Sequence, residues 1–106
     1  MYASLRTYRI ESGATEALMH RVDRDFAEAL SQEDGFVAYQ ALDTGNDMIM
    51  TISVFRSREQ AEASDALAAE WVADELKDFN ITRVGTIGGA VMVSRAMAEM
   101  LEPAHS

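Results

Sequence analysis

The stretch that decides the fold is MIMTISVF, residues 48–55, which holds no charged side chain. Alternation at period two predicts a β-strand with two distinct faces. These faces carry, respectively, Met48, Met50, Ile52 and Val54, and Ile49, Thr51, Ser53 and Phe55. Because apolar residues occur on both faces, we expect both faces of the strand to be covered.

The segments that flank this strand predict a hairpin and a helix. Residues 36–42, FVAYQAL, are a second strand-like run, and the turn residues 44–47 between the two runs indicate an antiparallel hairpin. On the other side, Ser57 and Gln60 have the spacing of a capping box. We therefore expect a helix from residue 58 to about residue 77.

The N-terminal third predicts one more strand and one more helix. Residues 2–10 alternate loosely and favour a strand. From residue 14, Leu18, Val22 and Phe26 recur at helical spacing until residues 33–35 end the helix.

The C-terminal part supplies the last predicted elements. Residues 83–94 favour a fourth strand, and residues 95–102 favour a short helix. The order β-α-β-β-α-β is that of the ferredoxin-like α+β fold, an antiparallel sheet with two helices on one face. We expect a single domain over residues 1–106, with its core at about 2–94 and a tail at 95–106.

Composition narrows the class of protein. The chain has 106 residues, a formal net charge of −9 and no cysteine, which excludes disulfides, thiol nucleophiles and cysteine-ligated metals. The negative charge argues against binding nucleic acid. The longest uncharged run, residues 84–94, has eleven residues, whereas about 20 are needed to cross a bilayer. We expect a cytoplasmic protein, and its eight Arg, one Lys and seventeen Ala are typical of a GC-rich bacterial genome.

The sheet face opposite the helices predicts a partner chain. A chain this short has two helices for one face of the sheet and no second layer for the other. Since that other face is also apolar, we expect a homodimer in which two sheets pack face to face. Nucleic acid and membranes are not expected partners.

Three motifs mark the borders of the predicted elements. They are Glu11-Ser12-Gly13 before a helix with Leu18, Glu33-Asp34-Gly35-Phe36 before a strand with Tyr39, and Phe55-Arg56-Ser57-Arg58-Glu59 at the second helix. Over about residues 2–94 the chain thereby resembles the antibiotic-biosynthesis-monooxygenase-like family of dimeric α/β-barrel proteins. The resemblance implies a ligand cavity between sheet and helices, and it implies either cofactor-independent quinone-forming oxidation or haem degradation.

Three positions argue against the haem-degrading branch. The resemblance implies an Asn, a Trp and a haem-ligating His where this chain has Arg6, Ser64 and Asp74. We therefore do not expect haem degradation.

The candidate catalytic residues are Arg6, Tyr8 and Trp71. If the face that Arg6 shares with Tyr8 looks toward the helices, the guanidinium could bind a carboxylate or phenolate through paired hydrogen bonds. Otherwise Arg6 is exposed or pairs with a helix acid such as Glu75. Tyr8 could bind a substrate oxygen and Trp71 could stack on a planar ligand, whereas the alternative for both is packing in the core or at the dimer interface.

The candidate substrate-binding residues are Tyr39, Met48, Met50 and Phe79, which are aromatic or adaptable side chains. In a packing module the same space would be filled by Met48, Met50, Trp71 and Phe79.

Two acidic residues and one histidine are further candidates for catalytic or metal-ligating groups. Asp65 and Glu75 project into the apolar sector of the second helix, where a carboxylate could be a general base. We prefer the alternative that this helix breaks into two shorter ones. His20 is expected to face water, and no paired His spacing indicates a metal, so we expect neither a metal nor a cofactor.

The function that we expect is cofactor-independent oxidation of a small aromatic or phenolic substrate, held by Arg6, Tyr8 and Trp71. The alternative is a non-catalytic homodimeric module that binds a small molecule or stabilises a partner. A cavity containing Arg6 and Tyr8 would favour the enzyme, and a filled core would favour the module.

Overall fold

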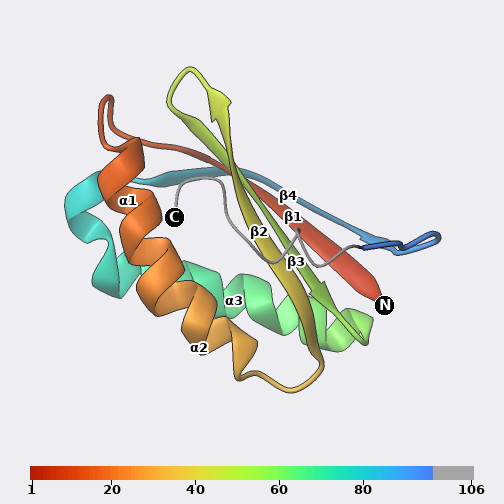
Figure 1. Ribbon diagram of the computed structural model, residues 1–106. Coiled ribbons are helices and arrows are strands. Elements are labelled where there is room, and N and C mark those ends of the chain that lie inside the picture. Colours follow the sequence, from red (N-terminus) through yellow and green to blue (C-terminus); the bar gives the residue numbers. More distant parts are fainter. Residues whose placement is uncertain (97–106) are drawn as a thin grey trace.

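The computed structural model describes residues 1–96 of the chain. Within them lies an antiparallel sheet in the order β2-β3-β1-β4, with all helices on one face (Figure 1). Its strands are β1 (Tyr2–Arg9), β2 (Phe36–Gly45), β3 (Met48–Phe55) and β4 (Thr82–Ala90). The predicted ferredoxin-like α+β fold is therefore confirmed, whereas most of the helix expected at residues 95–102 lies outside the described residues.

The first helix is a single rod with a π-helical turn in its middle. It runs through α1 (Thr15–Arg21), the π turn η1 (Val22–Phe26) and α2 (Ala27–Ser31). Its buried residues are four apart, and in a regular α-helix such a stripe drifts by about 120° between Leu18 and Leu30. A π turn has more residues per turn, so it removes much of the drift and keeps the stripe on the sheet.

The second helix, α3 (Arg58–Glu75), is unbroken, and the short 3₁₀ turn η2 (Lys77–Phe79) follows it. The preferred expectation of two shorter helices is therefore wrong. The predicted capping box is present: Gln60 N donates to Ser57 Oγ at 3.2 Å, and Ser57 N donates to Gln60 Oε1 at 3.2 Å.

Two strand boundaries differ from the sequence prediction. The β2–β3 hairpin is longer than expected, with Asn46 and Asp47 at positive φ in a tight two-residue turn. Strand β4 ends at Ala90 rather than at residue 94, because Ala90 pairs with Tyr2 at the very start of β1. Beyond that point β4 has no neighbouring strand left to pair with.

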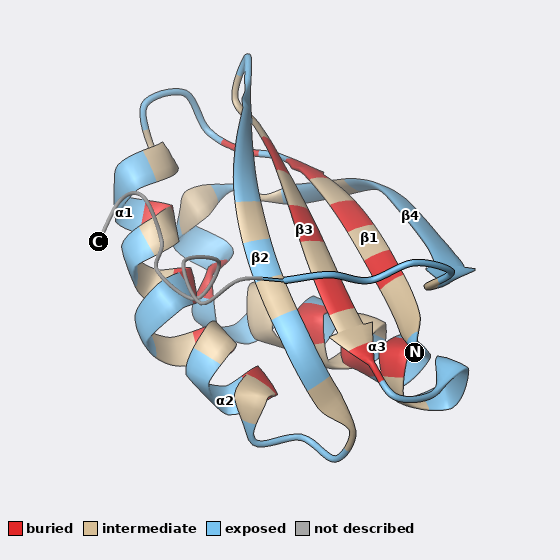
Figure 2. Ribbon diagram, turned by 45° about the vertical axis from the view of Figure 1, so that its right-hand side comes forward, coloured by how far each residue is buried: buried red, intermediate tan, exposed pale blue. Residues whose placement is uncertain are grey.

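The sheet separates a buried face from an open one. Buried residues alternate along β1 and β3 and meet the buried residues of the helices (Figure 2). Tyr39 and Trp71 pack against both of the two apolar clusters between the layers. These clusters contain Ile10, Leu18, Val22, Ile49 and Leu76, and Phe26, Leu30, Phe55, Ala61 and Ala68.

Among residues 1–96, no helix or strand covers the opposite face of the sheet, and most of its side chains are apolar. The residues that pair across all four strands include Gln40, Ile52, Leu5 and Ile87. Ile87 is 70% exposed. Among residues 1–96, no helix is long and apolar enough to cross a membrane.

Candidate active site

Arg6 lies at the centre of the buried face, with no solvent exposure. Its guanidinium donates from Nη1 to Asp65 Oδ1 at 2.8 Å and to Ser64 Oγ at 3.4 Å, and from Nη2 to Ser53 Oγ at 2.7 Å. Ser4 Oγ donates to the same Asp65 oxygen at 2.5 Å. A full charge is thus held between sheet and helix by one carboxylate and a group of hydroxyls.

Asp65 faces the sheet because it is the counterion of Arg6. This pairing explains why an acid sits in the apolar sector of an unbroken helix. Glu75, the counterion named in the sequence analysis, instead lies 3.8 Å from Arg21 on the first helix.

An inner pocket of about 40 Å³ lies beside Arg6, between the sheet and the helices. Two buried polar atoms in its lining, Arg6 Nε and Thr51 Oγ1, have no hydrogen-bond partner among the described residues. The rest of its lining is mainly apolar and includes Leu18, Val22 and Ile49. The pocket is large enough for a very small molecule, because one water needs about 10–15 Å³.

Tyr39 lines the same inner pocket. Burial raises the pKa of its phenol above the usual range, while the nearby charge of Arg6 acts in the opposite direction and is the weaker influence. Tyr39 therefore remains a protonated, neutral phenol at physiological pH. Its ring contacts Phe26 edge-to-face, with the centroids 5.7 Å apart.

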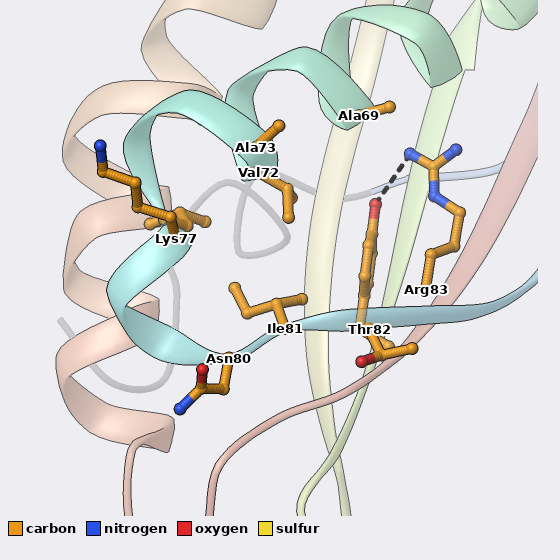
Figure 3. Close-up of a pocket in the computed structure, with 10 residues that line it drawn as sticks. Ala69, Val72, Ala73, Lys77, Asn80, Ile81, Thr82 and Arg83 are labelled. Carbon is orange, nitrogen blue, oxygen red and sulfur yellow. Dashed lines mark hydrogen bonds between the residues drawn. The ribbon is translucent and has the colours of Figure 1, made fainter.

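An outer cleft of about 590 Å³ adjoins the inner pocket. It lies between residues 69–77 of α3 and η2 and residues 80–83 at the start of β4, with Tyr8 at its base. Figure 3 shows Val72 of α3 and Ile81, the residue before β4, both lining it, with the stem of Lys77 at its edge and the ammonium group directed away.

A tyrosine and an arginine mark the inner end of the outer cleft. Arg83 Nη2 donates to Tyr8 Oη at 3.2 Å (Figure 3) and to the backbone oxygen of Asp65 at 3.0 Å. The guanidinium carbon also lies 5.6 Å from the centre of the Tyr8 ring. Four residues line both spaces, namely Tyr8, Val72, Leu76 and Ile81.

The structure brings together four of the seven candidates named from the sequence. Arg6, Tyr8, Tyr39 and Trp71 all line the inner pocket. Trp71 is also a packing residue, because its ring centre lies 5.2 Å from that of Phe26.

The other three candidates lie elsewhere. Met48 and Met50 pair with Arg9 and Thr7 on the open face of the sheet, so a place for them between sheet and helices is wrong. The reason is strand alternation, which sends Ile49 and Thr51 inward instead. Phe79 packs against an apolar cluster and lines neither the inner pocket nor the outer cleft.

Arg83 and Thr51 were missed by the sequence analysis. Thr51 shares a face with Ile49, Ser53 and Phe55, so alternation alone could have placed it near Arg6. Arg83 had no comparable signal, because its position depends on a register shift between β1 and β4 next to Tyr8.

No known protein family and no curated protein matches the chain at the level of sequence. Solved structures do match. A candidate antibiotic biosynthesis monooxygenase from Deinococcus radiodurans has a TM-score of 0.70 at 18% identity, over 92% of this chain and 98% of its own. A dimeric ferredoxin-like protein from an uncultured marine organism has a TM-score of 0.67 at 13% identity, over 92% and 100%.

A third match is a variant of MhuD with two manganese protoporphyrin IX molecules bound per active site. Its TM-score is 0.68 at 16% identity, over 92% of this chain and 100% of its own. These matches establish the fold: the chain has the ferredoxin-like architecture of the antibiotic-biosynthesis-monooxygenase-like proteins, as the resemblance implied.

Proposed function

We propose that the protein is a homodimeric, cofactor-independent monooxygenase-like enzyme that oxidises a small phenolic substrate bound in the outer cleft. The observation that carries the proposal is the Tyr8–Arg83 pair at the inner end of a cleft of about 590 Å³. Clefts of this size are typical of small-molecule sites, and a cation beside a phenol is suited to a substrate that becomes an anion.

Arg83 is the residue that we assign to phenolate binding. Its two intramolecular hydrogen bonds both use Nη2, so Nε and Nη1 make none with the described residues. A guanidinium has five N–H donors in a fixed fork, which leaves three for a ligand. Donation to the substrate oxygen lowers the pKa of the substrate phenol and raises the population of phenolate.

Tyr8 positions the same oxygen from the sheet side. Its hydroxyl accepts a hydrogen bond from Arg83 and is therefore free to donate a hydrogen bond to the phenolate. Arg6 does not bind the substrate oxygen in this proposal, because its two Nη groups already donate to Ser53, Ser64 and Asp65.

The overall reaction balances without an added reductant. A phenol and one dioxygen give a quinone and one water: one oxygen atom enters the ring, and the other leaves with two hydrogens from the substrate. The substrate supplies all four electrons that dioxygen accepts.

The homodimer is supported by the open sheet face. Four strands present apolar side chains there, and the dimeric ferredoxin-like protein described above has the same architecture. Haem degradation is not proposed, because the chain has Arg6, Ser64 and Asp74 where the resemblance implies the Asn, the Trp and the haem-ligating His of the haem-degrading branch.

Oxygen uptake with a panel of mono- and polycyclic phenols tests the activity. The variants are Tyr8→Phe and, as a matched control, Tyr2→Phe, which makes the same change on the same face of β1 outside both cavities. Losing a donor to a developing oxyanion costs on the order of 100-fold in rate, so Tyr8→Phe should lose most of its activity while Tyr2→Phe keeps it.

Two results would contradict the proposal. Equal activities of the two variants would remove Tyr8 from the site. Binding of phenols without oxygen uptake by the unmodified protein would instead identify the non-catalytic, ligand-binding alternative.

A further inference from the structure

We propose that the inner pocket is a dioxygen site, placed next to the substrate that the outer cleft holds. The role of the site in catalysis rests on the proposed function, whereas its occupation by a gas does not. Three observations carry the inference: the size of the pocket, its lining, and the position of Arg6.

Size selects a very small occupant. The inner pocket has about 40 Å³, whereas the outer cleft has about 590 Å³. A phenolic ring therefore cannot enter the inner pocket, but a diatomic molecule can.

The lining favours a gas over water. Ten of the fourteen lining residues are apolar, and the two unpartnered polar atoms are Arg6 Nε and Thr51 Oγ1. A buried water usually makes about three hydrogen bonds, whereas only these two atoms of the described residues are left unpartnered here, and mainly apolar cavities bind apolar gases. The two other polar residues of the lining are Tyr8, whose hydroxyl is bonded to Arg83, and Tyr39, whose phenol stays neutral.

Arg6 places a hydrogen-bond donor and a positive charge beside the pocket. Its Nε–H has no acceptor among residues 1–96. Its Nη groups, by contrast, donate hydrogen bonds to the hydroxyls of Ser53 and Ser64 and to the carboxylate of Asp65. Unreduced dioxygen is a weak acceptor, but superoxide is an anion that would accept this hydrogen bond. A donor and a positive charge fixed in advance stabilise the charge that develops on reduction.

The first chemical step follows from this placement. One electron passes from the phenolate in the outer cleft to dioxygen in the inner pocket, which gives a phenoxyl radical and superoxide with no proton transferred. Tyr8, Val72, Leu76 and Ile81 line both spaces, so the two spaces adjoin. Superoxide then crosses from the inner pocket into the outer cleft, where it combines with the phenoxyl radical to form the carbon–oxygen bond.

Paramagnetic relaxation of methyl NMR signals under dioxygen pressure tests the site without turnover or substrate. The methyl groups of Leu18, Val22 and Ile49 line the pocket, so they should relax several-fold faster than those of Leu30, which is fully buried in the other cluster. Equal enhancement at Leu30 would overturn the proposal.

A pair of variants on one helix makes the test sharper. Ala68→Val adds two methyl groups toward the inner pocket, whereas Ala69→Val makes the same change in the outer cleft alone. The dioxygen effect should disappear in the first variant and persist in the second. Its persistence in Ala68→Val, or water-to-Ile49 cross-relaxation with no dioxygen effect, would overturn the site.

The outcomes separate this inference from the proposed function. A dioxygen effect without phenol oxidation leaves the site standing and removes the enzyme. Phenol oxidation without a dioxygen effect at Leu18, Val22 and Ile49 leaves the enzyme and removes this site.

Discussion

Arg6 carries a positive charge at a position with no solvent contact, and the protein tolerates it because Asp65 lies 2.8 Å away. Removing one partner of a buried ion pair costs about 3–5 kcal/mol, while replacing both partners by apolar residues is often neutral. We expect Asp65→Asn to destabilise the fold by about 3 kcal/mol. The double variant Arg6→Met with Asp65→Leu should recover most of that loss, as measured by urea unfolding.

A second ion pair on the same helix is the control. Arg58 and Glu62 lie 2.7 Å apart, and both side chains are more than half exposed. Exposed pairs contribute about 0–1 kcal/mol, so Glu62→Gln should change stability little. If Asp65→Asn cost no more than Glu62→Gln, Arg6 would not depend on its counterion.

Tyr39 makes stability depend on alkaline pH. Burial raises the pKa of its phenol in the folded state, whereas the unfolded chain ionises near its ordinary value of about 10. The contribution of Tyr39 is therefore complete below pH about 10 and is lost as the pH rises further, by about 1.4 kcal/mol per pH unit.

Urea titrations of the unmodified protein and of Tyr39→Phe at several alkaline pH values measure this effect. The other tyrosines are common to both proteins, so the difference between the two isolates Tyr39. The unmodified protein should lose stability more steeply than the variant, and parallel curves would show that the phenol ionises as freely in the fold as outside it.

Arg6 and its neighbours show how far residue patterns predict a site. Alternation along β1 sufficed to place Arg6 and Tyr8 on one face, because side-chain direction in a strand has a fixed period. The choice between Asp65 and Glu75 as counterion depends on how the helix crosses the sheet, which periodicity along one element does not contain. The position of Arg83 is harder still to predict from the sequence, because an irregularity in the pairing of β1 with β4 turns it toward Tyr8.

At the scale of elements, Gly35 lies between the first helix and β2 and packs against the start of α3. Its φ is +79°, and a Cβ at this position would lie 1.9 Å from Gln60 Oε1, the atom that completes the capping box. We expect Gly35→Ala to cost about 1–2 kcal/mol for the left-handed backbone and about 1 kcal/mol more for the displaced cap.

Gly13→Ala separates these two costs. Gly13 has nearly the same φ, +81°, but a Cβ there would meet nothing within 4 Å. Thermal or urea unfolding should therefore show a larger loss for Gly35→Ala. Adding Gln60→Ala to Gly35→Ala should cost almost nothing further, and a full additive cost would mean that the cap survives the clash.

The predicted elements were most accurate where local chemistry defines their ends. Ser57 and Gln60 identify the start of α3 by their own hydrogen bonds. The π turn and the end of β4 depend on other parts of the chain: the first aligns a helix with the sheet beneath it, and the second falls where β1 offers no further partner. Such limits are set by tertiary contacts, so a single segment does not reveal them.

At the scale of the whole molecule, the sheet divides two tasks between its faces. The inner face holds the polar cluster around Arg6 and both cavities, while the outer face carries mainly apolar side chains, such as Leu5 and Ile52, and forms neither cavity. A partner on the outer face would therefore stiffen the strands that carry Arg6 and Tyr8 without blocking the outer cleft.

The proposed dimer predicts that one charged substitution on the open face separates the chains. Ile87 is 70% exposed in a single chain and lies level with Leu5 and Ile52 across the sheet. In a two-fold symmetric interface, each substitution occurs once in each chain, so Ile87→Asp would bury two unpaired carboxylates. An unpaired buried charge costs several kcal/mol. Light scattering should give twice the chain mass of 11.7 kDa for the unmodified protein and a single chain mass for Ile87→Asp. His20→Asp adds a similar charge to the exposed helix layer and should stay dimeric, whereas a dimer that survives Ile87→Asp would place the interface on another surface.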